Sequence, residues 1–228
     1  MRTRRQGGFT LIEVLVALVA MALLAVMSWR ALDGMSRVQQ QTETRADDVL
    51  TLQVGLAQWA ADLDAIVDMP NMTTLDWNGR VLRMGRRSTS APADGVLVVG
   101  WTRRVVNGRG MWLRWQSPQA FTRGDFSEAW LKADVWSQNP GVEEMAREVA
   151  IVPLDDWQIF FYRENAWTNP QSSAAKTTPA GVPALPGAIA QTVLPEGVRL
   201  VLTLPASQAI NGALTRDWVR PNLGRPQS

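Results

Sequence analysis

The sequence predicts an α+β protein in which one long N-terminal helix packs on a head rich in antiparallel β-sheet. Residues 9–69 contain no proline, and in the second half of this stretch apolar residues recur in steps of three and four, as on one face of a helix. After Pro70 the pattern changes to short runs of alternating apolar and polar residues, separated by turn-forming residues. These two observations place a helix first and a sheet after it.

A basic leader and an apolar segment begin the chain. The leader, residues 1–8, carries three arginines at Arg2, Arg4 and Arg5. A helix over residues 9–32 would be about 36 Å long at about 1.5 Å per residue, and the apolar core of a bilayer is about 30 Å thick. We therefore expect residues 9–32 to span a membrane. Because basic flanks stay on the cytoplasmic side, the leader should lie in the cytoplasm and the head in the periplasm.

Glu13 is the single acid within this apolar segment. A carboxylate in a membrane helix is costly and normally marks a function. One interpretation is an ordinary signal anchor with a poorly placed acid. An ordinary secretory signal, however, carries its cleavage site after the apolar core, whereas here the small residue Gly8 stands before it. The other interpretation is a segment that is cut before its core and packs against copies of itself.

Residues 8–13 (Gly-Phe-Thr-Leu-Ile-Glu), placed after the basic leader, resemble the class III signal of type IV prepilins and pseudopilins. In that family a prepilin peptidase cuts after the glycine and methylates the new amino terminus. The resemblance implies cleavage between Gly8 and Phe9, N-methylation of Phe9 and an assembly role for Glu13 at the fifth mature position. There the carboxylate would pair with the amine of a neighbouring subunit, and slippage would leave a charge uncompensated in a low-dielectric setting.

Residues 33–69 are expected to continue the same helix outside the membrane. Their apolar positions form one stripe, at Val49, Leu52, Leu56, Trp59, Leu63 and Ile66. We interpret this stripe as the face that packs on the head. The weakly apolar stretch Ser36–Asp48 suits a coiled seam with another subunit better. The whole helix should run from Phe9 to about Val67, because Pro70 disfavours helical conformation at the residue before it.

The head, residues 70–228, is predicted from turn signals and alternation. The Asn-Gly pairs at 78–79 and 107–108 each predict a hairpin turn. We expect strands at Val96–Val106, Met111–Gln116, Ala129–Ser137, Val149–Val152, Trp157–Arg163 and Val198–Leu204. Residues 168–195, rich in Pro, Ser, Thr and Ala, are typical of a long loop.

For two of the predicted strands, the sequence also predicts which side chains point to each face of the sheet. In Val198–Leu204, the even positions should point to one face and the odd positions to the other. In Ala129–Ser137, we expect the side chains of Leu131, Ala133 and Val135 to point inward. Trp130 and Trp136 should then share the outward face.

The composition argues against several classes of site. The chain has no Cys and no His, which excludes disulfides, thiol catalysis, Ser-His-Asp chemistry and Cys- or His-ligated metals. Loss of the three leader arginines would change the formal charge from +2 to −1, so bulk charge gives no support for nucleic-acid binding. Asp62 and Asp64 lie two apart on a helix and do not face each other. We therefore expect no enzyme activity, no metal, no cofactor and no nucleic-acid partner.

Tryptophan and arginine recur two residues apart. The pairs are Trp101 with Arg103, Trp112 with Arg114 and Trp218 with Arg220. On one strand face, a guanidinium can stack on an indole, and such a surface can bind sugars, single-stranded nucleic acid or protein. The alternative, which we favour, is a sheet whose large residues cover the core and whose arginines cap them.

Further short motifs resemble the minor pseudopilin J family of type II secretion. They are residues 29–33 (Trp-Arg-Ala-Leu-Asp), 59–63 (Trp-Ala-Ala-Asp-Leu), 157–162 (Trp-Gln-Ile-Phe-Phe-Tyr), Trp167 and 194–198 (Leu-Pro-Glu-Gly-Val). The resemblance implies a non-enzymatic subunit at the tip of a periplasmic pseudopilus, held in the inner membrane by a single span. Its implied partners are the I, K and H minor pseudopilins, the major pseudopilin, the prepilin peptidase and secreted proteins.

Two other functions stay open at this point. A minor pilin of a type IV pilus would carry the same N-terminal signal. A single-pass periplasmic protein could instead use the Trp-Arg face to hold a ligand. Association of the head with the I and K pseudopilins would favour the pseudopilin J assignment, and binding of a small ligand or glycan alone would favour the ligand-binding protein.

Overall fold

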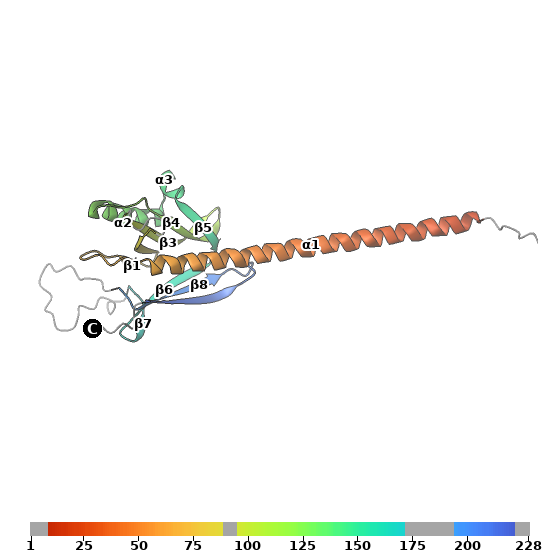
Figure 1. The fold of residues 1–228 in the computed structure, drawn as a ribbon. Coiled ribbons are helices and arrows are strands. Elements are labelled where there is room, and N and C mark those ends of the chain that lie inside the picture. The colour runs from red at the N-terminus through yellow and green to blue at the C-terminus, as the bar shows by residue number, and fades with distance from the viewer. Residues whose placement is uncertain (1–8, 89–94, 172–193, 222–228) are drawn as a thin grey trace, which may run out of the picture. The chain divides into compact units, whose positions relative to one another are not determined.

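The computed structural model describes residues 9–88, 95–171 and 194–221 (Figure 1). The chain divides into two compact units, residues 1–47 and residues 48–228. The first unit contains the beginning of helix α1, and the second contains the end of α1 together with both sheets. The predicted α+β architecture, a long N-terminal helix with antiparallel sheet, is confirmed.

Helix α1 spans Leu11–Asp64. It ends earlier than the predicted stop near Val67, and the reason is a backbone interaction with the sheet. Ile66 forms an isolated antiparallel bridge with Arg86, and the N–H of Val67 donates to the carbonyl of Gly85 at 3.0 Å. The chain therefore leaves the helix to pair with strand β2 before it reaches Pro70.

The first sheet, called sheet A, is antiparallel with the order β1-β2-β3-β4-β5. Its strands are β1 (Leu75–Trp77), β2 (Val81–Arg87), β3 (Val96–Val106), β4 (Arg109–Gln116) and β5 (Glu148–Pro153). Both predicted hairpins are confirmed, since β1 pairs with β2 and β3 with β4. At the second turn Asn107 and Gly108 have φ values of 51° and 78°, the left-handed conformation that an Asn-Gly hairpin requires.

The strand predicted at Ala129–Ser137 is wrong, because these residues belong to helix α2 (Arg123–Gln138). The helix starts with a capping box, in which the N–H of Asp125 donates to Thr122 Oγ1 and the N–H of Thr122 donates to the Asp125 carboxylate. A short helix, α3 (Val142–Met145), follows.

The predicted faces of this segment are also wrong in part, because the true period is that of a helix. Leu131 and Val135 are 66% and 57% exposed, and Trp136, expected outside, is fully buried. Ala133 is buried as expected, on the face that α2 presents to sheet A.

The second sheet, called sheet B, is antiparallel with the order β7-β6-β8-β9. Its strands are β6 (Asp156–Arg163), β7 (Ala166–Thr168), β8 (Gly197–Leu204) and β9 (Gly212–Val219). The predicted alternation of β8 is confirmed: its even residues are buried, and its odd residues from Arg199 onward are partly exposed. Strands β7 and β9 were not predicted. Most of the loop predicted at 168–195 lies outside the described residues.

Four layers build the second unit, in the order α2, sheet A, the end of α1 and sheet B (Figure 1). The end of α1 lies between the two sheets and contributes Leu52, Trp59 and Leu63 to a core cluster that includes residues of both. Helix α2 covers the other face of sheet A with a separate cluster around Trp115 and Trp136. Sheet A is thus buried on both faces, which explains why its strands contain so many large apolar residues.

Candidate assembly site

The N-terminal end of α1 carries the predicted assembly residues. Gly8 and the leader arginines lie outside the described residues, and Phe9 is 86% exposed. Glu13 occupies the third helical position, where its Oε2 accepts hydrogen bonds from the N–H and the hydroxyl of Thr10, each at 3.2 Å. Glu13 therefore caps the first turn of its own helix. Within the described part of the chain, no hydrogen bond reaches its second carboxylate oxygen.

The first part of α1 presents its apolar side chains outward all round. Leu11, Leu24 and Met27 are 84%, 64% and 69% exposed. An 18-residue window of the helix has a mean hydropathy of 2.6, and none of it is buried. By length and composition, this helix can cross a membrane. A helix that is apolar on every side needs a lipid or protein environment.

The polar stretch that follows is held by interactions within the helix. Arg37 pairs with Asp33 one turn earlier at 2.9 Å, and the Gln39 amide donates to Glu43 at 3.0 Å. All four side chains are exposed. Such pairs stabilise a helix by only a few tenths of a kcal/mol each. This stretch therefore gains little stability from contacts within its own chain.

The predicted packing stripe lies at the end of α1, toward the head. Leu52, Trp59 and Leu63 are buried, with 3% or less of their surface exposed. Leu56 and Ile66 are partly buried against the same cluster. Val49, at the start of the stripe, is half-buried.

Gly55 lets the helix approach the sheet closely on this side. A Cβ built at Gly55 would collide with the Cγ2 of Ile151 on β5 and would lie 3.3 Å from the ring of Trp112. Only a glycine fits there without movement of the neighbours. By contrast, a Cβ built at Gly34 meets nothing within 4 Å.

A buried ionic cluster ties the end of α1 to sheet A, and sequence reasoning missed it. Asp62 is fully buried near the C-terminus of the helix. Its carboxylate binds the Arg86 guanidinium from β2 and accepts two bonds from Arg114 on β4, at 2.8 and 2.9 Å. The indole N–H of Trp101 and the amide of Gln58 complete the set, each at 2.9 Å.

The cluster compensates two costs at once. A carboxylate buried without partners loses its hydration, and an acid at a helix C-terminus also opposes the helix dipole. Two guanidinium groups and two neutral donors offset both, and they come from three strands of sheet A and from α1 itself. Removal of one partner of such a buried pair typically costs about 3–5 kcal/mol. Asp62 therefore fixes how the end of α1 sits on sheet A.

The pairs Trp101 with Arg103 and Trp112 with Arg114 do not form the ligand-binding face that was considered from the sequence, whereas Trp218 and Arg220 both line a pocket. Trp101 and Trp112 are fully buried, with ring centroids 4.5 Å apart. The guanidinium of Arg114 lies 6.0 Å from the ring of Trp101, its cross-strand partner, rather than on Trp112. Arg103 donates instead to the carbonyl of Leu154 at 2.9 Å. These indoles belong to the core.

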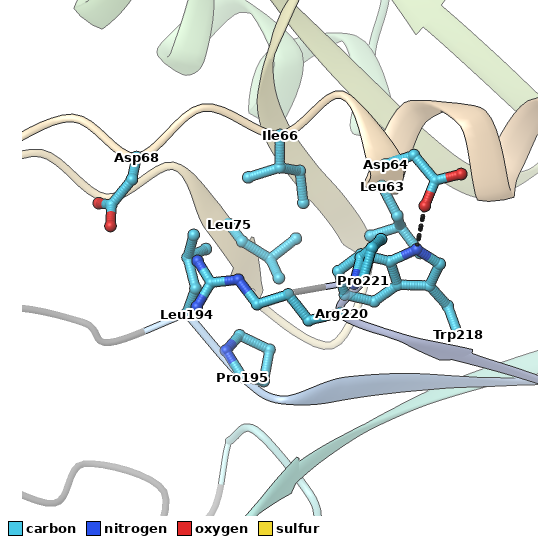
Figure 2. A pocket seen from close by; sticks show the side chains of 10 residues that line it. All are labelled: Leu63, Asp64, Ile66, Asp68, Leu75, Leu194, Pro195, Trp218, Arg220 and Pro221. Atoms are coloured by element: carbon cyan, nitrogen blue, oxygen red, sulfur yellow. Dashed lines mark hydrogen bonds between the residues drawn. The ribbon is translucent and has the colours of Figure 1, made fainter. Parts of the chain in front are cut away.

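A pocket opens beside the end of α1 (Figure 2). Its apolar lining consists of Leu63, Ile66, Leu75, Leu194, Pro195, Trp218 and Pro221. Asp64, Asp68 and Arg220 add charged groups, and the indole N–H of Trp218 donates to Asp64 at 2.7 Å. Its volume is about 380 Å³. Within the described residues, no cluster of three or more acidic side chains has the geometry to hold a metal ion.

Comparison with known proteins agrees with the sequence motifs. Residues 3–29 match the family model of the prokaryotic N-terminal methylation motif. The chain is 26% identical to type II secretion system protein J of Vibrio cholerae serotype O1 over 197 residues, which cover 77% of this chain and 81% of that protein. It is 36% identical to protein J of Klebsiella pneumoniae over 64 residues, which cover 28% and 32% of the two chains.

The chain is also similar to a solved structure. This structure is the GspK-GspI-GspJ complex from the type 2 secretion system of enterotoxigenic Escherichia coli, in which the matched chain is 18% identical with a TM-score of 0.43. The match covers 79% of this chain and 99% of that chain. The chain thus carries a prokaryotic N-terminal methylation motif and resembles type II secretion system protein J over most of its length.

Proposed function

We propose that this chain is a non-enzymatic minor pseudopilin of a type II secretion system. The observation that carries the proposal is the combination, in one polypeptide, of the methylation motif at residues 3–29 with similarity to protein J across 77% of the chain. The head acts in the tip complex that initiates pseudopilus assembly and supports export across the outer membrane. Its partners are the I, K and H minor pseudopilins, the major pseudopilin and the secreted proteins.

The N-terminus is prepared for this role by processing. A prepilin peptidase cuts between Gly8 and Phe9 and methylates the new amine, which leaves the apolar part of α1 in the mature protein. Residues 9–32 anchor the subunit in the inner membrane, with the cut end facing the cytoplasm and the head in the periplasm. The exposed apolar residues of this segment favour the proposal, because their partners must come from lipid or other subunits.

Glu13 has two tasks in this scheme. It caps its own helix through Thr10, and it pairs with the methylated amine of a neighbouring subunit. The pair forms in a low-dielectric environment, where an unmatched charge costs several kcal/mol. Subunits can therefore stack only in the register that matches amine with carboxylate.

The proposal is tested by complementation in cells that lack the gene for this chain. Wild-type protein should restore appearance of secreted proteins in the medium. Because the chain has no Cys, single cysteines placed on exposed positions of the head provide unique sites for crosslinking in living cells. Crosslinks to I- and K-type pseudopilins are the expected result. Crosslinks to the subunits of a type IV pilus, with unchanged secretion, would assign the chain to that machine instead.

A further inference from the structure

Strand β9 forms a long open edge of sheet B. Among the described residues, the sheet order ends at β9, and no strand pairs with its outer side. The other edge strands are short or interrupted: β1 and β7 have three residues each, and β5 has six, lies next to a register shift in its pairing with β4 and ends in Pro153. Strand β9 has eight residues and no proline. Proteins normally blunt an edge of this length.

The backbone groups on the outer side of β9 can be assigned from its register. Arg220 N–H donates to the carbonyl of Glu196, which extends the β8–β9 ladder. Hydrogen-bonded pairs alternate along an antiparallel ladder, so the even residues of β9 are bonded to β8. The N–H and C=O groups of Ala213, Thr215, Asp217 and Val219 therefore point away from the sheet.

The pocket of Figure 2 lies at the C-terminal end of this edge. Trp218, Arg220 and Pro221, at or just after the end of β9, all line it. Its volume of about 380 Å³ is at the small end of the range for ligand pockets, roughly 300–1,000 Å³, and suits one or two side chains. Asp68 is exposed and, among the described residues, forms no ion pair. With Asp64 it gives the pocket an excess of negative charge over Arg220.

We propose that the outer edge of β9 binds an extended segment of another polypeptide, which adds a strand to sheet B and inserts a side chain into this pocket. Main-chain hydrogen bonds from the odd residues of β9 supply the affinity, as in other cases of strand addition. The pocket selects a large apolar side chain next to a Lys or Arg, because its walls are apolar and its charge is negative. This inference does not depend on the proposed function.

The test is a selection of random ten-residue peptides on the purified full-length chain in detergent. Thr215→Pro removes an outward N–H and leaves the β8–β9 ladder intact, and Thr215→Ala is the matched control that keeps the N–H. We expect enriched peptides to bind wild type and Thr215→Ala equally, and Thr215→Pro about tenfold more weakly, since one main-chain hydrogen bond is lost and the proline ring crowds the added strand. Equal thermal unfolding midpoints of the three chains exclude misfolding.

The charge preference is tested by repeating the selection on Asp68→Lys. We expect wild type to enrich Lys or Arg beside an aromatic or branched apolar residue, and Asp68→Lys to lose this preference. Peptides that bind all variants equally, or no enrichment over the Thr215→Pro chain, would overturn the proposal. Thr215-dependent dimers of the chain alone, measured by sedimentation, would assign the edge to a second copy and would also overturn it.

Discussion

The first and last parts of α1 belong to one continuous helix, but they meet their partners in opposite ways. Before Asp47 large apolar side chains such as Leu24 and Met27 are exposed, whereas after it Leu52, Trp59 and Leu63 are buried by the head. The last part is apolar on one stripe and packs within its own chain. Within the first part, residues 11–32 are apolar on nearly every side, and their large side chains are exposed. The distribution of apolar residues around a helix, rather than their number, therefore indicates where its partner lies.

The largest effect is expected on secretion, from a substitution at Glu13 in the first part of α1. Glu13→Gln keeps the cap, since Gln also serves at this position, but removes the charge. We expect secretion to be lost while membrane insertion and the unfolding midpoint of the head stay unchanged. Asp33→Asn, which neutralises an exposed carboxylate further along the same helix, is the matched control and should secrete normally. Normal secretion by Glu13→Gln would show that the charge is not needed for assembly.

The next largest effect is expected on the stability of the head, from a substitution at Asp62 in the last part of α1. Asp62→Ala leaves Arg86 and Arg114 without their buried carboxylate and should lower the free energy of unfolding of the head by about 3–5 kcal/mol. Urea unfolding followed by tryptophan fluorescence measures it. Asp68→Ala, an exposed acid one turn beyond the helix, should change stability by no more than about 0.5 kcal/mol. Equal stability of the two variants would contradict the assigned role of Asp62.

The two glycines of α1 offer a direct comparison of its parts. Gly55→Ala places a methyl group against Ile151 and should destabilise the head by about 1–3 kcal/mol. Gly34→Ala adds the same group where nothing lies within 4 Å, so it should favour the helix by up to about 1 kcal/mol. Circular dichroism during thermal unfolding distinguishes the two. A loss of stability at Gly34 would mean that this part does pack on its own chain.

The smallest effect is expected on the outer face of sheet B. Hydrogen bonds from Arg199 lower the pKa of Asp217 below its usual value. Because the pKa is lower in the folded state, ionised Asp217 stabilises the protein at pH values above its unfolded-state pKa. This contribution is lost as the pH falls through the folded-state pKa. The stability difference between wild type and Asp217→Asn should therefore be present at neutral pH and disappear in acid. A difference that persists in acid would contradict this.

Local signals in the sequence predicted much of this fold. The Asn-Gly turns were predicted correctly because Gly79, Asn107 and Gly108 adopt the left-handed conformation that glycine and asparagine favour. Strand β8 was predicted because its alternation is regular and both of its faces are well defined. Residues 129–137 were misread as a strand because their apolar residues fit a period of two, while the capping residues Thr122 and Asp125, which mark a helix start, lie earlier.

Other features depend on contacts that a sequence does not reveal. Asp62 meets Arg86 and Arg114, which lie 24 and 52 residues away, so no spacing rule connects them. Strand β9 was missed because most of its residues are exposed and show no clear alternation. By contrast, the predicted signal that contains Gly8, Phe9 and Glu13 is recognisable from the sequence, because residues 8–13 are contiguous and no long-range contact defines them.

The cut before Phe9 is the step on which the assembly role of the first part rests, and intact-mass spectrometry of the purified chain tests it directly. In cells with a prepilin peptidase, we expect the mature protein to begin at Phe9 and to carry one N-methyl group, and Gly8→Ala to retain more of the leader. A wild-type chain that keeps residues 2–8 in such cells would contradict the account.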